Sequence, residues 1–347
     1  MEFCYPAPAT RLSDRQQAHK YMIRIGLLGA SRVSRYAVIA PAEAIDDVSV
    51  SAVAARDATR AATFAEENGI PHVVPDYQAL VTNDAVDVVY NGLPPSGHAH
   101  WSIAALEAGK HVLCEKPFAL DAGEARAMVS AAERTGNVLI EAYHYRFHPL
   151  FARVLELIRA RSIGAIRELD AHFNVRISAD GGEIRYDPAL GGGAMMDLGC
   201  YCVHWVRSVM GAEPEVLSAS ATRHASGVDV AMQAVLGFAD GVRARVSSSM
   251  SEELPEGLDA GLVVTGERGR LSVTNPVAPH MGHELVLETP QDTTREEVAG
   301  NTTYYHQLQH LRDVLSGEAS PLTGGDDAIA NMRVLDRIYR LSGIRQD

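Results

Sequence analysis

Two side chains that stand far apart in the chain, a lysine and a tyrosine, have the chemistry of proton transfer. Lys116 follows a short apolar run and precedes Pro117, which disfavours helical backbone at the lysine, so we expect an ammonium group at the end of a strand. Tyr201 supplies a phenol much further along the chain. A nearby cation favours the phenolate, so Lys116 is expected to lower the pKa of Tyr201 and ease proton exchange with a substrate hydroxyl. The alternatives for Lys116 are a structural ion pair with Glu115 and a contact with a phosphate. The alternative for Tyr201 is a buried phenol whose hydroxyl is hydrogen-bonded within the protein.

Asp197 stands four positions before Tyr201, a spacing that places both side chains on one face of a helix. We expect its carboxylate to take part in catalysis by positioning either the lysine or a hydroxyl, and capping of the helix is the alternative. The glycines Gly191–Gly193 come just before it. Because glycine has no Cβ atom, this run predicts a close approach of the backbone to a ligand or to the sheet.

A candidate nucleotide-binding turn lies at the first expected strand and helix, and it reads Gly26-Leu-Leu-Gly29-Ala-Ser31-Arg32-Val33. Glycine permits the tight turn, and the amino terminus of the following helix faces phosphate oxygens. Ser31 occupies a position where another glycine is expected. We expect Gly26, Gly29, Ser31, Arg32 and Val33 to contact a dinucleotide, and a strand–helix turn without a ligand is the alternative.

Arg56 lies at the end of the second expected strand, Val48–Ala55. An acidic residue at that place suits the ribose of NAD, whereas an arginine suits the 2′-phosphate of NADP. Asp57 follows and is expected to cap the next helix. Because Arg56 precedes Asp57, the sequence favours NADP(H) as the cofactor, and NAD(H) remains possible. The alternative role for Arg56 is a surface ion pair with Glu66 or Glu67.

A loop rich in proline and glycine follows another expected strand and is predicted to lie over the cofactor. We expect Leu93 and Pro94 in this loop to contact the cofactor. His98 is expected to contact its ribose or nicotinamide, or else to start a helix as an ordinary polar side chain. Glu115 and Lys116 are expected beside the same cofactor.

The segment Glu141–Pro149 spans the expected domain junction. His144 is expected to line the cleft toward the substrate, and Arg146 to line it beside the cofactor. Tyr305 lies in a late expected helix, from which it either reaches the substrate or packs against the sheet.

The elements that must position these side chains fall into two groups. From residue 23 to 142, short apolar runs alternate with amphipathic segments, a pattern typical of βαβ units in a doubly wound parallel sheet whose ligands bind at the carboxyl ends of the strands. After Pro149, longer β-rich runs predict an open, mostly antiparallel sheet with a helix near Asp197–Met210. The fold class is therefore α/β, with a loose tail at 1–21, a dinucleotide-binding Rossmann domain at 22–142 and a substrate-binding and oligomerisation domain at 143–347.

Composition narrows the classes of function. A length of 347 residues, 46% of them hydrophobic, is typical of a soluble protein with two domains. The net charge of −13 argues against nucleic acid and anionic membrane as partners. The four cysteines lack the spacing of a disulfide framework or a zinc site, so we expect reduced thiols, no metal and a cytoplasmic location.

In this order and spacing, the segments resemble the Gfo/Idh/MocA oxidoreductase family. The resemblance rests on the turn from Gly26, on Glu115-Lys116-Pro117, on Arg146-Phe-His-Pro149 and on the segment from Gly191 to Tyr201. It implies that Lys116 is the active-site lysine and that the second sheet often forms the interface of a homodimer or homotetramer. Many members have histidine at the position of Tyr201. Tyrosine there is similar to the branch of dimeric dihydrodiol dehydrogenase, NADP-linked xylose dehydrogenase and glucose–fructose oxidoreductase, which uses tyrosine as the acid/base and prefers NADP(H).

The resemblance departs from the family pattern at His204, which stands where sugar- and inositol-oxidising relatives have aspartate and which we place among the substrate contacts. The prediction is hydride transfer between NADP(H) and a secondary alcohol or carbonyl of a sugar, cyclic polyol or trans-dihydrodiol. Tyr201 is expected to move the proton and Lys116 to polarise the oxygen. A cofactor-dependent glycosidase that oxidises transiently and a non-catalytic regulator that senses NADP or sugar remain the alternatives.

Overall fold

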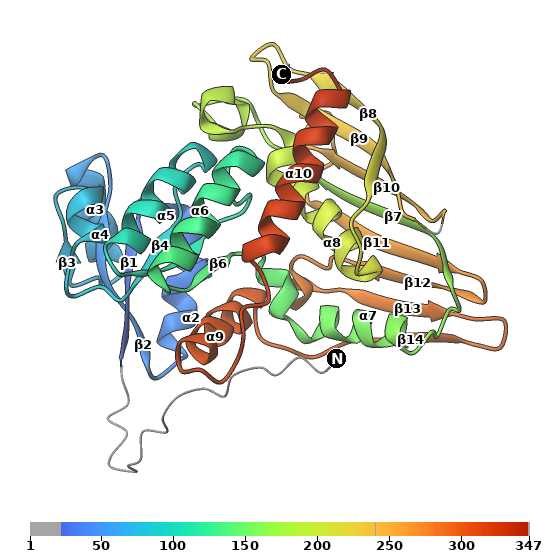
Figure 1. Ribbon diagram of the computed structural model, residues 1–347, viewed down its shortest axis with the longest axis horizontal. Helices are drawn as coiled ribbons and strands as arrows, with labels where there is room; N and C mark the ends of the chain where they lie inside the picture. The colour runs from blue at the N-terminus through green and yellow to red at the C-terminus, as the bar shows by residue number, and fades with distance from the viewer. Residues whose placement is uncertain (1–21, 240, 346–347) are drawn as a thin grey trace, which may run out of the picture.

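The computed structural model describes residues 22–239 and 241–345 (Figure 1). The expected tail at 1–21 lies outside the described residues. Two sheets account for the strands of the described residues, one near each end of the molecule in Figure 1.

The first sheet has six strands in the order β3-β2-β1-β4-β5-β6, and every neighbouring pair is parallel. Helices cover its faces, as expected for βαβ units. The strands are β1 (Ile23–Leu28), β2 (Val48–Ala54), β3 (His72–Val73), β4 (Val88–Asn91), β5 (His111–Cys114) and β6 (Leu139–Glu141). The helical segments are α1 (Arg32–Ser34), the π-helix η1 (Arg35–Ile39), α2 (Ala40–Glu43), α3 (Ala58–Glu67), α4 (Tyr77–Val81), η2 (Pro95–Gly97), α5 (His98–Glu107) and α6 (Ala122–Thr135).

The second sheet has eight strands in the order β14-β13-β12-β11-β7-β10-β9-β8. Only β7 and β10 pair in parallel among its described strands, so the prediction of a mostly antiparallel sheet is confirmed. The strands are β7 (Ile166–Val175), β8 (Glu215–Arg223), β9 (Asp229–Gly237), β10 (Arg243–Ser249), β11 (Leu258–Gly266), β12 (Gly269–Thr274), β13 (Glu284–Glu288) and β14 (Thr293–Glu296). The helical segments of this half are η3 (His144–Phe147), α7 (Pro149–Arg159), η4 (Ile184–Tyr186), η5 (Pro188–Leu190), the π-helix η6 (Met195–Gly199), α8 (Cys200–Met210), η7 (Pro279–Met281), α9 (Thr303–Leu315) and α10 (Gly325–Leu341).

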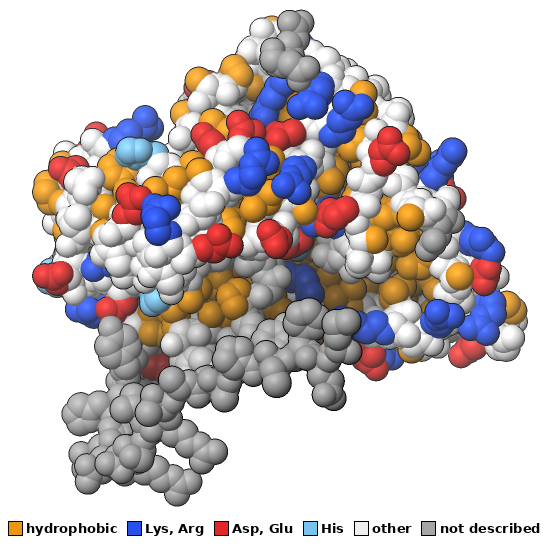
Figure 2. Space-filling model, viewed as in Figure 1, with side chains coloured by type: hydrophobic (Ala, Val, Ile, Leu, Met, Phe, Trp, Pro, Cys, Tyr) orange, Lys and Arg blue, Asp and Glu red, His pale blue; other side chains and the backbone are white. Residues whose placement is uncertain are grey.

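One face of the second sheet is buried and the other carries charge. Alternate residues of β7, such as Leu169 and Phe173, are buried, which follows from the period of two in a strand. Helices α8 and α10 lie between this sheet and the first domain (Figure 1). On the other face, Arg245 of β10 pairs with Glu168 and Asp170 of β7. The space-filling view shows acidic and basic side chains interspersed rather than gathered by sign on the face that it presents (Figure 2).

Helix α9, which follows the second sheet in the sequence, returns to the first domain. Leu308, Leu311 and Val314 of α9 belong to the hydrophobic cluster that contains Ile25 and Leu27 of β1. Helix α9 therefore packs with the Rossmann sheet, although the sequence analysis placed it with the second domain. This packing brings the first residues of α9 next to η3, at the junction of the two halves.

Candidate active site

Lys116 lies just beyond the carboxyl end of β5, at the sheet edge where β1 and β4 also end. Its Nζ atom donates to Oδ1 of Asp197 at 2.8 Å and to the Asp197 carbonyl oxygen at 2.9 Å. The preceding Glu115 is buried and accepts a hydrogen bond of 2.8 Å from the Tyr90 hydroxyl. Asp197, from the second half of the chain, therefore orients Lys116, and Tyr90 of β4 orients Glu115.

Lys116 and Tyr201 meet in space, as the sequence analysis expected. The Nζ atom of Lys116 lies 5.1 Å from the centroid of the Tyr201 ring, a distance typical of a cation–π contact. The phenol oxygen has a different partner, because it shares a hydrogen bond of 2.9 Å with Nε2 of His144. The two side chains thus converge on one region, with the ammonium over the ring and the hydroxyl turned to a histidine.

The expectation that Lys116 lowers the pKa of Tyr201 is wrong for this structure. Burial, with smaller contributions from Tyr304 and Glu115, raises the pKa of Tyr201 well above its ordinary value. Only 3% of Tyr201 is exposed, and the charge of Lys116 is compensated by Asp197. Tyr201 therefore carries its proton at neutral pH.

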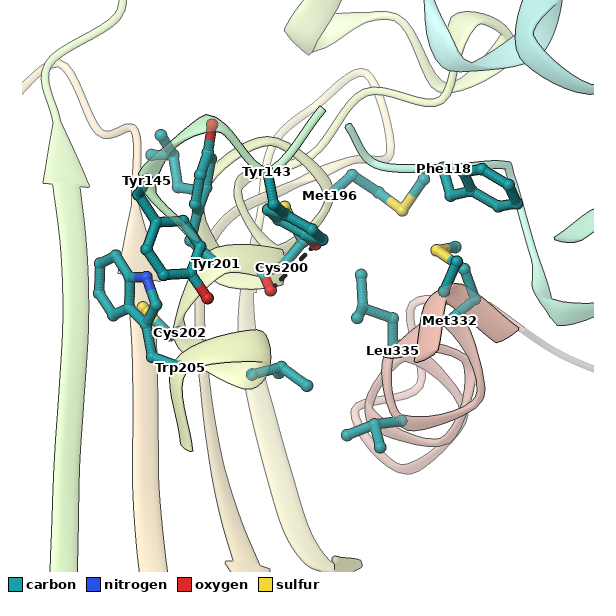
Figure 3. Packing of buried hydrophobic residues seen from close by; sticks show 14 of the residues in the cluster. Phe118, Tyr143, Tyr145, Met196, Cys200, Tyr201, Cys202, Trp205, Met332 and Leu335 are labelled. Atoms are coloured by element: carbon teal, nitrogen blue, oxygen red, sulfur yellow. Dashed lines mark hydrogen bonds between the residues drawn. The ribbon is translucent and has the colours of Figure 1, made fainter. Parts of the chain in front are cut away.

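The rings around Tyr201 come from several elements. Figure 3 shows Tyr201 close to Tyr145 and Trp205, with Met332 and Leu335 of α10 across the cluster. The Tyr201 ring centroid lies 5.9 Å from that of Tyr145 and 6.2 Å from that of Trp205. This packing fixes the plane of the phenol ring and keeps water from most of it.

Asp197 lies in the π-helix η6, directly before α8, and it anchors the lysine. Its carboxylate pairs with Lys116 through Oδ1 and with Arg185 through Oδ2. Burial opposes the charge, but Lys116 and Arg185 outweigh it and hold the pKa of Asp197 well below its usual range. The same ion pair keeps the pKa of Lys116 above its ordinary value despite burial. The helix-capping alternative for Asp197 finds no support here, because the carboxylate faces two cations.

The three glycines serve packing inside the protein. A Cβ atom on Gly192 would lie 2.4 Å from the carbonyl oxygen of Arg185, and one on Gly193 would lie 2.3 Å from Oδ1 of Asp229. Asp229 is buried and accepts a hydrogen bond of 2.7 Å from the backbone N–H of Met195, at the start of η6. The close approach predicted from the glycines is therefore to other parts of the chain, and it supports the π-helix that carries Asp197.

His144 lies at the centre of the junction instead of on an open wall. Its Nδ1 atom is 2.8 Å from Oγ1 of Thr303, and its Nε2 atom faces Tyr201. Burial, followed by the charges of Lys116 and His280, lowers the pKa of His144 to about 3, so the ring is neutral. The sequence analysis did not single out Thr303, since threonines before a helical run usually indicate only a cap.

The aromatic side chain that reaches the site from α9 is Tyr304. Its ring centroid lies 4.1 Å from that of His144, and its other neighbour is Tyr36 at 5.6 Å. Tyr305, which the sequence analysis selected, packs instead with the hydrophobic cluster of the first domain and with His306. Successive residues of a helix point about 100° apart, so Tyr304 and Tyr305 have different neighbours, and the contacts of Tyr305 favour the alternative in which it packs.

His204 is buried instead of facing a substrate, and Arg146 lies beside Phe151. His204 is buried, with Nδ1 bonded to the Tyr145 hydroxyl and Nε2 at 2.8 Å from Oδ2 of Asp327. Both ring nitrogens are engaged, which disfavours the predicted contact with a substrate. The guanidinium of Arg146 lies 5.6 Å from the ring centroid of Phe151.

The nucleotide turn has the expected backbone. Gly29 has a φ of +92°, which favours glycine, and its N–H donates to the Ala54 carbonyl oxygen at 2.8 Å. Ser31 caps the helix, because its Oγ atom accepts from the Ser34 N–H at 3.3 Å. A Cβ atom on Gly92 would lie 3.2 Å from the same Oγ atom, so the loop after β4 touches the turn. The serine in place of a glycine is therefore explained by its capping role.

A hollow of about 460 Å³ lies beside this turn. Three arginines, Arg32, Arg35 and Arg60, line it, and Arg60 also donates to the Ala30 carbonyl oxygen at 2.9 Å. Asp57 caps α3, as expected, by accepting from the Arg60 N–H. Arg56 is exposed at the end of β2, and Glu67 pairs with Arg35. Sequence reasoning missed Arg35 and Arg60, because helical surface arginines are ordinary.

His98 holds the loop that was expected to cover the cofactor. Its ring nitrogens lie 2.9 Å from the Pro117 carbonyl oxygen and 2.8 Å from that of Leu93. The side chain is fully buried. This geometry favours the structural interpretation, in which His98 ties the Leu93–Pro94 loop to the turn after Lys116.

His148 should make the protein sensitive to acid. It is buried, its Nε2 atom has no hydrogen-bond partner in the described chain, and its Nδ1 atom accepts from Leu150 N–H at the start of α7. Burial, with His306 next, lowers its pKa to about 4. Because the unfolded histidine binds a proton from about pH 6.5, this residue should cost about 1–3 kcal/mol of stability as the pH falls from about 6.5 to 4.

His148→Asn keeps a capping side chain, so we expect it to flatten the acid-induced loss of stability between neutral pH and pH 5. Urea unfolding at the two pH values measures this, with the exposed His72→Asn as the control. An unchanged pH dependence in His148→Asn would contradict the assignment.

Neither a metal site nor a membrane-spanning helix is found in the described part of the chain, residues 22–239 and 241–345. No group of three or more His, Cys, Asp or Glu side chains there is arranged to hold a metal ion. No helix in that part is long and apolar enough to cross a membrane.

Comparison with known proteins gives matches along most of the chain. The model of an oxidoreductase family with an NAD-binding Rossmann fold matches residues 23–143, and the GFO/IDH/MocA C-terminal domain matches residues 151–272. D-xylose 1-dehydrogenase (NADP(+)) 2 of Haloferax volcanii is 34% identical, over 90% of this chain and 95% of the relative. Trans-1,2-dihydrobenzene-1,2-diol dehydrogenase of Danio rerio is 32% identical, over 93% and 97%. A solved 3-ketoreductase from Actinomadura kijaniata, in complex with NADP and TDP-benzene, is 28% identical with a TM-score of 0.83, over 92% and 98%.

Proposed function

Since the chain belongs to the Gfo/Idh/MocA oxidoreductase family, we propose that it is an NADP(H)-dependent enzyme of the dihydrodiol and xylose dehydrogenase branch. It transfers hydride between nicotinamide and a secondary alcohol or carbonyl of a sugar, cyclic polyol or trans-dihydrodiol. The observation that carries the proposal is the meeting of Lys116 and Tyr201 at the carboxyl edge of the Rossmann sheet, where ligands of such sheets bind.

The residues present fit a dinucleotide. The positive φ of Gly29, the capped helix that follows and the close approach of Gly92 form a backbone cradle of the kind that binds a pyrophosphate. The arginines of the adjacent hollow would hold the additional phosphate of NADP, with Arg32 and Arg60 as the candidates. When bound, NADP(H) supplies or accepts the hydride.

The chain's own residues handle the proton and the charge. In reduction, Tyr201 donates its proton to the carbonyl oxygen, which the protonated phenol of this structure is ready to do. In oxidation, Tyr201 first gives up its own proton, and the phenolate oxygen then takes the proton from the substrate hydroxyl. The ammonium of Lys116, oriented by Asp197, stabilises negative charge on the substrate oxygen.

The outer face of the second sheet would join copies of the chain in a homodimer or homotetramer. Its support is the family resemblance.

A substrate screen tests the proposal. The purified chain is titrated with NADP(H) and NAD(H), and the near-ultraviolet absorbance of the reduced cofactor is followed with aldoses, cyclic polyols, trans-dihydrodiols, their carbonyl counterparts and glycosides. We expect tighter binding of NADP(H) and a change in absorbance with at least one alcohol or carbonyl. Glycoside cleavage without net change in absorbance would favour the glycosidase alternative. Binding without any turnover would favour the regulator.

A further inference from the structure

We propose that His144 and Thr303 form a buried hydrogen-bond chain that positions the hydroxyl of Tyr201 for proton transfer. The proposal rests on the function proposed above and assigns both side chains as positioning residues. His144 is thereby removed from the wall of the substrate cleft, where the sequence analysis had placed it.

This hydrogen-bond chain joins three elements that are far apart in the sequence. Thr303 Oγ1 lies 2.8 Å from His144 Nδ1, and His144 Nε2 lies 2.9 Å from the Tyr201 hydroxyl. Thr303 is the first residue of α9, His144 the first of η3, and Tyr201 lies in the first turn of α8. All three residues are at most 3% exposed, so water does not compete for these hydrogen bonds.

The surroundings hold the imidazole in one orientation. The Tyr304 ring packs on one side of His144 at a centroid distance of 4.1 Å. Thr302, and not Thr303, caps α9, since its Oγ1 atom accepts from Tyr305 N–H at 3.1 Å. The Thr303 hydroxyl therefore has no capping role and is directed to the histidine.

A neutral imidazole carries one N–H, so the hydrogen bonds from Thr303 to Tyr201 can run in either of two directions. With the hydrogen on Nδ1, the ring donates to Thr303 and accepts from Tyr201, so the phenol keeps its proton on the side of the histidine. With the hydrogen on Nε2, the ring donates to Tyr201 and accepts from Thr303, and the phenol hydrogen is then free to go to a carbonyl. The lowered pKa of His144, about 3, agrees with a neutral ring in both cases. Because a threonine hydroxyl both donates and accepts, Thr303 supports either tautomer.

The test compares Thr303→Val with Thr303→Ser. Valine has nearly the shape of threonine but no hydroxyl, and serine keeps the hydroxyl. We expect Thr303→Val to lower kcat about threefold to tenfold, the effect of one net hydrogen bond, with KM for NADP(H) unchanged. Thr303→Ser should restore kcat to within about twofold of the parent protein. A role in folding alone would lower thermal stability in both variants without this split between kcat and KM.

Tyr201→Phe separates the two proposals. If Tyr201→Phe loses activity while Thr303→Val keeps the parent kcat, the positioning chain is overturned and the proposed function stands. If Tyr201→Phe keeps full activity, Tyr201 is not the acid/base, and the proposed positioning role of His144 and Thr303 is overturned as well. Should Thr303→Val not fold, Thr303→Ala removes the same hydroxyl with less bulk and is judged by the same criteria.

Discussion

Lys116→Ala is expected to lower kcat by a factor of about 10²–10⁴, the usual effect of losing one electrostatic or acid–base partner. The ammonium would no longer stabilise charge on the substrate oxygen. Asp197 would also lose one of its two cations, while Arg185 keeps its carboxylate compensated and limits the damage to the fold. Initial rates at saturating NADP(H) and substrate measure the effect.

The control for this variant is Lys110→Ala. Lys110 lies six positions earlier and donates to the Asn83 carbonyl oxygen at 2.9 Å, away from the site. Its removal should leave kcat within about twofold of the parent value, because surface interactions of this kind contribute little. A folded, NADP(H)-binding Lys116→Ala protein with normal turnover would show that the lysine has no catalytic role.

Tyr201→Phe is expected to lower kcat by about 10²–10³-fold in both directions, because the variant lacks the hydroxyl that exchanges the proton with the substrate. The variant also leaves Nε2 of His144 without its partner in a buried place, which should cost about 1–3 kcal/mol of stability. The measurement is turnover at several pH values together with thermal unfolding.

Tyr145→Phe is the matched control, because Tyr145 belongs to the same aromatic cluster and its hydroxyl also bonds to a buried histidine, His204. It should lose stability by a similar amount while keeping most of its kcat. Equal losses of kcat in both variants would mean that the cluster matters for packing and that Tyr201 has no special chemical role.

The element pattern was accessible from sequence because it depends on local periodicity. The alternation of apolar strands and amphipathic helices gave the Rossmann sheet, and the longer β-rich runs after Pro149 gave the mostly antiparallel second sheet. Strand β14, Thr293–Glu296, was missed, since its polar residues carry no such pattern and its pairing comes only from β13. The sequence predicts a helix at Tyr304–Ser316, close to the true bounds of α9, Thr303–Leu315, but it does not predict the packing partner of that helix.

The sequence by itself determined the fold class and the strand–helix turn, and it selected Lys116, Asp197 and Tyr201 as candidates, because these inferences depend on residue type, order and local spacing. Only the tertiary structure decided which atom each side chain faces. It turned the Tyr201 hydroxyl to His144, set Lys116 over the phenol ring and brought Thr303 and Tyr304 next to His144. The physical reason is that a hydrogen bond forms within about 3 Å and at a narrow angle, and contacts among residues from three distant segments are fixed only when the whole core packs.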